Sequence, residues 1–305
     1  MMDAKALNTW KEKLAYLEQQ ESSASDPAMK KNIQQQIKEC KEKILSGTQL
    51  DNALLPLNYN QQFDRYRDFF ETYSQDHIGA FLIHGQSKSC QQWLVHRLIC
   101  HVPGDTDPKK ILVRLDKNES HIEDFWKILA AQLNIGRDTP PEKIVEAVYR
   151  HYADTVILLF DNLDKLYNKE IGKILDQFWI PLVEKVLENT NERERPYLLM
   201  FLVDNTGCSP EWNINFLQLE NCNPNQRMIQ PIKLPKIERF SLQTLKKWVR
   251  TNPKLFKIPV DNYLALETLA QEFYDSTCGV PEDVMKAICK KCECQWSDLM
   301  NRINL

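Results

Sequence analysis

The stretch FLIHGQSKSCQQWLVHRLI, residues 81–99, changes from an apolar run to a polar loop at Gly85. The run before Gly85 is short and continuous, which is typical of a strand buried on both faces. The residues after Cys90 lead into a predicted helix. The stretch is therefore predicted to form a strand, a loop at its carboxyl end, and a helix.

Apolar runs of this kind recur along the chain, with amphipathic segments between them. Alternating strands and helices predict an open parallel sheet that is covered by helices on both faces. The predicted strands are residues 80–84, 111–115, 155–160 and 197–203, with a weaker one at 229–234, and the predicted helices include 122–133, 144–152 and 171–187.

The loop after the first strand lies where a phosphate-binding loop of the pattern G-x-x-x-x-G-K-[ST] would begin. Gly85 supplies the first glycine, but Cys90 replaces the second, and Gln91 and Gln92 replace the lysine and the hydroxyl residue. A Cβ at position 90 and two neutral amides leave neither a backbone cradle nor a cation for phosphate. Lys88 could reach a phosphate from within the loop, but it is expected to be a solvated side chain.

A second landmark is TVILLFDNLDKL, residues 155–166, where Asp161 ends the third strand and Asp164 follows three residues later. In phosphoryl-transfer proteins a carboxylate at this place holds magnesium, and a following one activates water. Asn162 cannot act as such a base. Two interpretations stay open: a metal-binding carboxylate, or a strand-to-loop turn whose side chains bond nearby backbone.

The chain from residue 236 onward carries no strand pattern and is predicted to be a helical bundle with helices at 241–250, 261–275 and 281–294. Within it, CGVPEDVMKAI places Gly279 and Pro281 before a helix. A Gly-x-Pro turn is a favourable helix start, and it also lies where a lid would close over a nucleotide base.

The first 50 residues are predicted to form an α-helical hairpin of coiled-coil type. Asp26–Pro27 is a favourable helix start, Gly47 is a helix stop, and a linker, TQLDNALLPLNYN (48–60), is expected to follow. Because a two-helix unit seldom buries enough surface to be stable alone, its apolar stripes are predicted to bind a protein partner, with a solvated hairpin as the alternative. The stripes comprise Leu7, Trp10, Leu14 and Leu17, and Ile33, Ile37 and Ile44.

These segments together resemble the STAND class of signal-transducing P-loop ATPases, most closely its inactive branch. The resemblance covers roughly residues 55–295 and is carried by the two stretches around Gly85 and Asp161, by IKLPKIERFSLQTLKKWV (232–249) and by CGVPEDVMKAI. The hairpin is similar to effector-associated adaptor modules. The resemblance implies a vestigial nucleotide site made of Gly85, Lys88, Gln91, Gln92, Asp161, Asp164, Gly279 and Pro281.

The resemblance further implies a catalytically inactive scaffold or adaptor in bacterial, especially cyanobacterial, conflict or stress signalling. The expected partners are effector proteins or an identical chain, bound through the hairpin, and no cofactor and no catalytic residue is expected. A switch that binds a nucleotide without hydrolysing it is the alternative. The predicted domains are the hairpin over residues 1–50, the degenerate NTPase-like α/β domain over 51–235 and a helical lid subdomain over 236–305.

The net charge of −3 does not suggest nucleic acid as an obligate partner. Lysine pairs such as Lys109–Lys110, and the cluster of Lys246, Lys247 and Arg250, leave nucleic-acid binding as a third alternative to a solvated helix face. No stretch is long enough to span a membrane and no signal peptide opens the sequence, so a cytoplasmic location is expected.

Nine cysteines, an odd number, favour reduced thiols over a disulfide framework. The CKKCEC cluster, with Cys289, Cys292 and Cys294, invites a zinc site. Zinc usually takes four ligands from two separated pairs, however, and the cluster has no second pair. A helix end with part-buried thiols is therefore expected.

Overall fold

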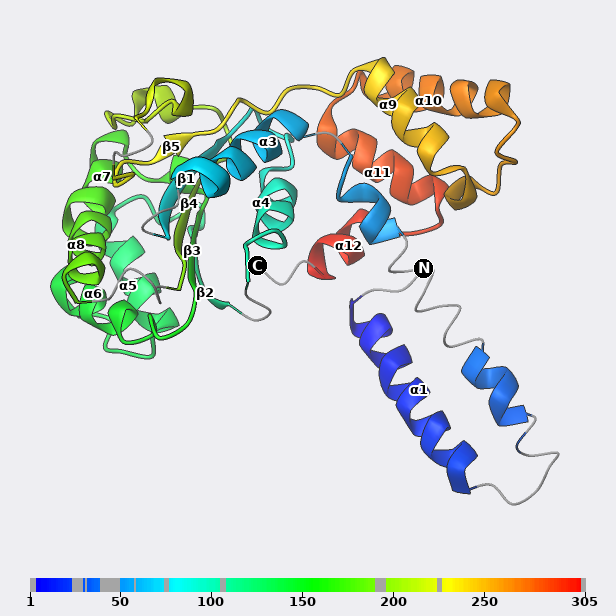
Figure 1. Cartoon of the computed structure of the whole chain (residues 1–305), viewed down its shortest axis with the longest axis horizontal. Coiled ribbons are helices and arrows are strands. Elements are labelled where there is room, and N and C mark those ends of the chain that lie inside the picture. Colours follow the sequence, from blue (N-terminus) through cyan, green and yellow to red (C-terminus); the bar gives the residue numbers. More distant parts are fainter. Residues whose placement is uncertain are drawn as a thin grey trace. The chain divides into compact units, whose positions relative to one another are not determined.

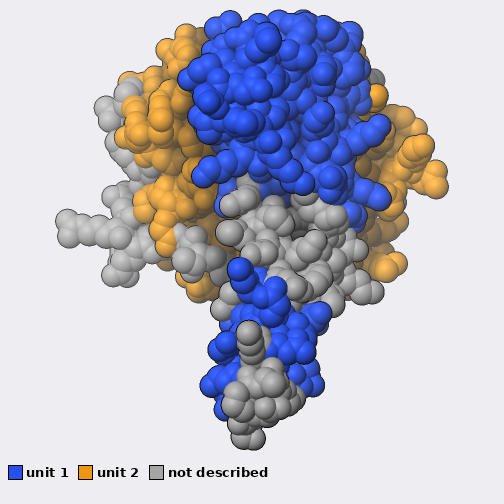
Figure 2. All heavy atoms as spheres, turned by 90° about the vertical axis from the view of Figure 1, so that its right-hand side faces the viewer, with its two compact units in different colours: residues 1–58, 239–304 blue, residues 59–238, 305 orange. Residues whose placement is uncertain are grey.

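The computed structural model describes residues 4–23, 30, 32–38, 50–57, 59–73, 77–104, 108–189, 196–223 and 227–302. The chain divides into two compact units (Figure 2). Unit 1 combines residues 1–58 with 239–304, and unit 2 comprises residues 59–238. The three-part division predicted from the sequence stays a prediction.

Unit 2 is built on a parallel sheet of five strands in the order β2-β3-β4-β1-β5. Every residue of β1, β3 and β4 is buried, as expected for central strands of a sheet that is covered on both faces. The predicted α/β fold with a helix-flanked parallel sheet is confirmed. The strands are β1 (Ile78–His84), β2 (Lys109–Arg114), β3 (Val156–Asp161), β4 (Leu198–Asp204) and β5 (Ile232–Lys233).

Helices cover both faces of this sheet (Figure 1): α3 and α4 lie on one face and α5, α6, α7 and α8 on the other. The strand order explains this arrangement, because the crossover from β1 to β2 runs opposite to those from β2 through β4, and right-handed crossovers then lie on opposite faces. The helices are α3 (Asn60–Asp68), α4 (Gln91–Ile99), α5 (Ile122–Gln132), α6 (Pro141–Tyr149), α7 (Asn168–Ile174) and α8 (Ile180–Asn189).

The long helix predicted over residues 171–187 is interrupted. A π-helical segment, Leu175–Trp179, separates α7 from α8. Phe178 and Trp179 are both fully buried there, although adjacent residues of a regular α-helix point about 100° apart. The indole Nε1 of Trp179 donates to the carbonyl oxygen of Ile229 at 2.7 Å. The wider turn thus directs two neighbouring aromatic side chains inward.

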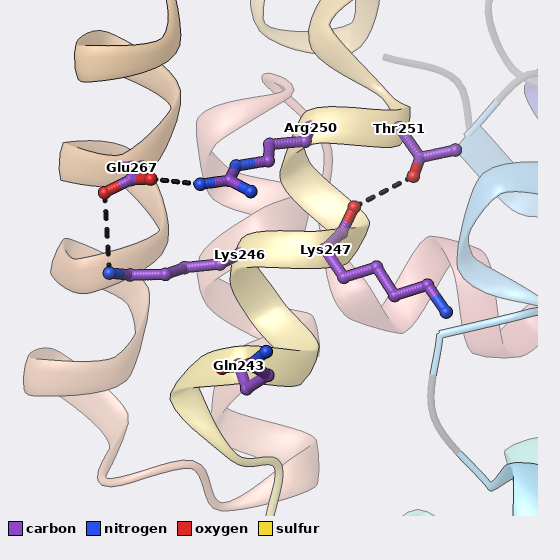
Figure 3. A pocket seen from close by; sticks show the side chains of 6 residues that line it. All are labelled: Gln243, Lys246, Lys247, Arg250, Thr251 and Glu267. Carbon is purple, nitrogen blue, oxygen red and sulfur yellow. Dashed lines mark hydrogen bonds and ion pairs between the residues drawn. The ribbon is translucent and has the colours of Figure 1, made fainter.

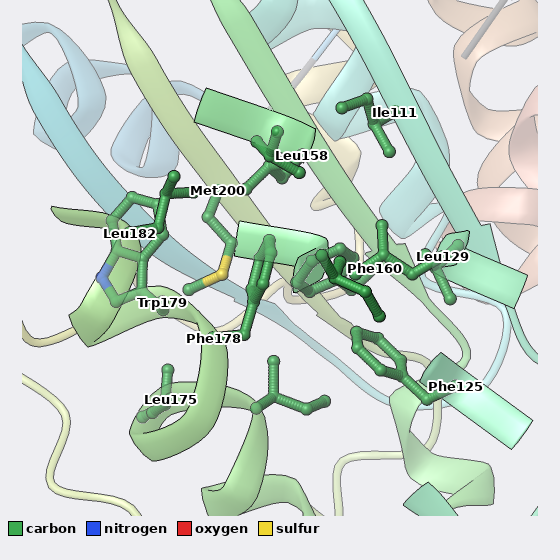
Figure 4. Close-up of a cluster of buried hydrophobic side chains, with 14 of the residues drawn as sticks. Ile111, Phe125, Leu129, Leu158, Phe160, Leu175, Phe178, Trp179, Leu182 and Met200 are labelled. Atoms are coloured by element: carbon green, nitrogen blue, oxygen red, sulfur yellow. The ribbon is translucent and has the colours of Figure 1, made fainter. Parts of the chain in front are cut away.

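Aromatic rings pack among the aliphatic side chains of the core between the sheet and α5–α8 (Figure 4). The ring of Phe160, from β3, meets that of Phe125 edge to face, with 4.9 Å between centroids, and that of Phe178 at 6.0 Å. On the opposite face of the sheet, Phe81 stacks on Phe201 at 5.6 Å. Both faces of the sheet are therefore filled by interlocking rings.

In unit 1, the three helices predicted for the bundle are present as α9, α10 and α11, and α12 follows them. Side chains cap two of its helices: Ser241 accepts from the backbone N–H of Thr244, and Asn262 from that of Ala265. None of the helices in the described ranges is long and apolar enough to cross a membrane. The helices are α9 (Leu242–Thr251), α10 (Tyr263–Thr277), α11 (Pro281–Lys291) and α12 (Trp296–Arg302).

The prediction of a linker over residues 48–60 is wrong for residues 50–57, which the structure describes. Residues 50–54 are helical, and Leu50, Leu54 and Leu57 are buried. The indole Nε1 of Trp248, in α9, donates to the carbonyl oxygen of Ala53 at 2.7 Å. The leucine spacing gives this segment an apolar side, which makes it part of the packing of unit 1.

The N-terminal segment contains α1 (Ala4–Ser23) and a helical stretch at residues 32–38. Leu17, Ile33 and Ile37 are buried against one another, and the partly buried Leu14 packs on them. Leu7 and Trp10 lie in α1, but their side chains are outside the described residues, as are Ile44, the Asp26–Pro27 start and the Gly47 stop. All four stripe residues whose side chains are described therefore lie in the inner seam of the predicted hairpin.

Candidate functional site at the carboxyl edge of the sheet

The ends of four strands bring polar residues together along one edge of the sheet. Arg114 and Asp161 are paired in register at the ends of β2 and β3, and His84 and Asp204 at the ends of β1 and β4. The crossovers that leave β1 and β3 run over opposite faces of the sheet, and ligands of open α/β sheets bind at such a point, beyond the carboxyl ends. This edge is therefore the candidate site of unit 2.

Asp161 is fully buried, and four donors surround its carboxylate. Its Oδ2 accepts from Nε2 of Gln92 at 2.7 Å and from Nε of Arg114 at 2.8 Å. Its Oδ1 accepts from the backbone N–H of Asn162 and from Nδ2 of Asn205, each at 2.9 Å. A carboxylate offers about four lone-pair sites. These four hydrogen bonds occupy them, which leaves no lone pair for a metal ion. Asp161 thus lies in the strand-to-loop turn that was one of its two interpretations.

Asp164 is held in the same network. Its Oδ1 accepts from the backbone N–H of Asn205 at 3.2 Å, and Nζ of Lys165 lies 3.7 Å from its Oδ2. Arg114 and Lys165 each form an ion pair with one of the two carboxylates. The pairing of Asp161 with Arg114 could not be read from the sequence, because Arg114 comes from another strand.

The loop after β1 is filled by its own side chains. A Cβ on Gly85 would lie 2.8 Å from Cβ and Oγ of Ser89, so the loop closes too tightly there for any other residue. The buried amide of Gln91 donates from Nε2 to the carbonyl oxygens of Gln86 and Asp204, each at 3.1 Å. Lys88 is exposed, with φ at 66°. The amide of Gln91 ties the loop to β4 at the position where a phosphate-binding loop has its lysine.

Asp204 is a second fully buried carboxylate at this edge. Its Oδ1 accepts from the backbone N–H groups of Thr206, Gly207 and Cys208 at 2.8–3.2 Å, and its Oδ2 accepts from that of Ser209 at 2.7 Å. Its donors are the backbone of the following turn, which makes Asp204 the organiser of the loop after β4.

Gly279 and Pro281 belong to unit 1, whereas the other residues of the predicted nucleotide site belong to unit 2. Gly279 has φ at +71°, and a Cβ on it would lie 2.2 Å from the carbonyl oxygen of Phe240. Its own carbonyl oxygen accepts from the N–H of Phe240 at 2.7 Å. Pro281 is the buried first residue of α11. The close approach of the Phe240 backbone accounts for a glycine at position 279, and the start of α11 accounts for a proline at position 281.

One group of metal-ligating side chains gathers within 4.8 Å in the part of the chain that the structure describes: His121, Glu123 and Glu170. Glu170 is already engaged, because its Oε2 accepts from the N–H of Ile122 at 3.0 Å and its Oε1 lies 3.3 Å from Nζ of Lys173. The bond to Ile122 caps the start of α5. The positive end of the helix dipole lies there and disfavours the binding of a cation. The group is explained by helix capping.

The thiols of Cys289, Cys292 and Cys294 are buried, and no disulfide joins them to one another. Burial, together with the neighbouring Cys294 and Glu293, raises the pKa of Cys292 to about 12. Because the thiolate is the form that binds metal, this environment opposes ligation at Cys292.

Two histidines of unit 2 should make its stability depend on pH. Burial lowers the pKa of His84, whose ring lies against the carbonyl oxygen of Leu234 at 2.9 Å. Burial, assisted by Lys110, lowers the pKa of His96 from 6.5 to about 4. Between pH 6.5 and about 4, His96 is protonated in the unfolded chain but not in the folded one. The free energy of unfolding should therefore fall as the pH is lowered through this range. Thermal melts across this window should show a smaller decrease for His96→Gln, and an unchanged decrease would assign the effect to other groups.

The set of site residues predicted from the sequence lacks Arg114, Asp204 and Asn205. Each occupies or follows the last position of a strand, and that position was the available signal. Which strand ends become neighbours depends on the strand order, which a single sequence does not state. With the geometry known, the edge is a set of carboxylates and amides whose hydrogen-bonding capacity is taken up internally.

Residues 54–203 match the family model described as inactive STAND. Among curated proteins, none matches the chain. The matched segment contains β1, β2, β3 and most of β4, and with them the loop after Gly85, Asp161 and Asp164. The sequence-based resemblance and the parallel sheet agree with this match. Residues 54–203 of the chain form a domain of the inactive STAND family.

Proposed function

We propose that the chain is a non-enzymatic signalling scaffold that uses an inactive STAND fold as a fixed platform. The observation that carries the proposal is the saturated carboxylate of Asp161, whose donors include the side chain of Gln92 and the guanidinium of Arg114. In an active relative of this architecture, a hydroxyl residue and a magnesium ion would meet at this point. Here a hydrogen-bonded amide and a permanent cation supply the contacts from within the protein.

The chemistry of phosphoryl transfer supports the same proposal. Such catalysis depends almost wholly on positioning and on stabilising charge that develops on the transferred group. The lysine position holds Gln91, whose amide is committed to two backbone carbonyl oxygens. A neutral amide that faces backbone offers no stabilisation to a phosphoryl group, so hydrolysis is not expected.

Thermal melts with and without MgATP test this proposal, and no shift is expected. A ligand that binds only the folded state at about 100 times its dissociation constant would add about 2.7 kcal/mol to the free energy of unfolding. A shift that Asp161→Asn abolishes would contradict the proposal and favour the non-hydrolysing nucleotide switch.

A rebuilt loop sharpens the test. The triple variant Cys90→Gly, Gln91→Lys, Gln92→Thr restores the phosphate-loop pattern but leaves Arg114, Asn162 and Asn205 on the carboxylate of Asp161. It should fail to bind MgATP, and adding Arg114→Ser should improve binding relative to the triple variant. Binding by the triple variant alone would show that the internal bonds around Asp161 do not block the site.

We further propose that the N-terminal hairpin carries the protein contacts of this scaffold, with an effector protein or a second copy as partner, in bacterial conflict or stress signalling. The support is the resemblance of the hairpin to effector-associated modules and the packing of its inner seam within the hairpin itself. Its buried side chains Leu17, Ile33 and Ile37 form a cluster distinct from the core of unit 2.

Deleting residues 1–47 should therefore leave the melting transition of unit 2 within a few degrees of the full chain, while partner capture or self-association is lost. The reason is that Leu14, Leu17, Ile33 and Ile37 pack against one another within the hairpin. Light scattering and differential scanning calorimetry of both chains measure the two effects. Trp10→Ala with Ile37→Ala should reproduce the loss of binding, and an aggregated or non-cooperative deletion variant would instead assign the segment a bracing role.

A further inference from the structure

A cationic hollow lies over the outer face of α9, in unit 1, independent of the edge around Asp161. It encloses about 520 Å³. In Figure 3, Lys246 and Arg250 extend from α9 towards α10, Lys247 and Thr251 extend to the other side, and Gln243 lies about one turn earlier on α9. Three cations and the single carboxylate of Glu267 line it, so the hollow carries a net positive charge.

Glu267, from α10, orients two of these three cations. Its Oε2 lies 3.5 Å from Nζ of Lys246, and its Oε1 accepts from Nη2 of Arg250 (Figure 3). One carboxylate thus holds two cationic groups in place and offsets only one charge. Lys247 adds a third cation that Glu267 does not bind.

An exposed aromatic residue lies on α10, one helical turn from Glu267. Tyr263 is one helical turn before Glu267, and residues four apart lie on the same side of a helix. Glu267 contacts α9, so Tyr263 is placed on the α10 side that borders the hollow. Its side chain is 63% exposed, and the adjoining Leu264 is 80% exposed. A large planar apolar surface therefore borders the cationic lining in water.

We propose that the hollow binds single-stranded nucleic acid, with the phosphate backbone over Lys246, Lys247 and Arg250 and a base stacked on Tyr263. A cationic groove beside an exposed aromatic ring is the arrangement that proteins use for single strands, because every base has a face that can stack. A duplex keeps its bases stacked internally and would leave the ring unused. The sequence favoured a merely solvated helix face, because it showed neither the hollow nor Tyr263 beside it.

Fluorescence anisotropy of the full chain with a labelled oligothymidine of about 20 nucleotides tests the proposal. Affinity should fall with salt, with a log–log slope of about −2 if three phosphates are neutralised. Lys247→Glu with Arg250→Glu should reduce affinity at least about tenfold, because two attractive charges become repulsive. Lys109→Glu with Lys110→Glu makes the same charge change at the other lysine pair and should leave affinity unchanged, so an equal loss there would overturn the assignment of the site.

Two single variants separate binding from folding. Glu267→Gln removes the one opposing charge and should tighten binding several-fold, a gain that a folding defect cannot produce. Tyr263→Ala should weaken oligothymidine binding about tenfold by removing the stacking surface, yet leave any binding of inorganic pyrophosphate unchanged. Equal binding of duplex and single strand, an unaffected Tyr263→Ala, or an unaffected Glu267→Gln would each overturn the proposal, and binding of pyrophosphate alone would identify a simple anion site instead.

Discussion

The Asp204→Ala variant should lose about 3 kcal/mol of unfolding free energy, a large share of the stability of a typical domain. The carboxylate of Asp204 is buried and accepts hydrogen bonds from the backbone N–H groups of residues 206–209. Alanine leaves these donors without an acceptor, and a buried unsatisfied donor costs about 1–3 kcal/mol. The N–H of Ser209 is the most affected, because that residue is itself buried.

Urea unfolding measures this loss, and two control variants interpret it. Asp204→Asn keeps one acceptor oxygen and should lose less than alanine. Asp138→Ala removes an exposed aspartate and should change stability by less than about 0.5 kcal/mol. Equal stability of Asp204→Ala and the unmodified chain would mean that water replaces the carboxylate in the turn after β4.

The Phe160→Ala variant should be destabilised by about 3–5 kcal/mol, the usual cost of emptying a buried aromatic site. The ring of Phe160 is fully buried and packs edge to face on Phe125 and beside Phe178 (Figure 4). Its removal leaves a cavity between β3 and the π-helical segment, and loses ring contacts on two sides.

Phe160→Leu is the matched control, because it retains most of the volume while removing the aromatic contacts. Its free energy of unfolding, measured with a chemical denaturant, should lie between that of the unmodified protein and that of Phe160→Ala. A stability loss for Phe160→Ala below about 1 kcal/mol would show that the surrounding side chains collapse into the cavity.

The strands were predictable because each central strand is a continuous apolar run. Residues 155–160, for example, were predicted as a strand, and β3 begins at Val156 and ends at Asp161. The π-helical segment at Leu175–Trp179 was not predictable, because its apolar residues fit a regular helix equally well. The leucines of residues 50–57 were mistaken for a linker since their packing partners in unit 1 lie about 200 residues later in the sequence.

The candidate site was predictable in position but not in chemistry. Gly85, Gln91 and Asp161 lie along the predicted edge of the sheet, and Gln91 and Gln92 already indicated lost phosphate contacts. The sequence could not decide whether Asp161 is a metal ligand or part of a hydrogen-bonded turn, because its partners Arg114 and Asn205 come from other strand ends. Such a network depends on strand order, whereas a motif records only neighbours along the chain.

The outer edge of the sheet constrains how copies of the protein can assemble. β2 is the edge strand, and its first two residues, Lys109 and Lys110, are exposed. A second β2 that paired with this strand would bring ammonium groups together, and natural proteins use lysine on edge strands to prevent such pairing. At the opposite edge, β5 offers only two residues. Neither edge favours growth of a continuous intermolecular sheet, so filaments that form by strand pairing between copies are disfavoured.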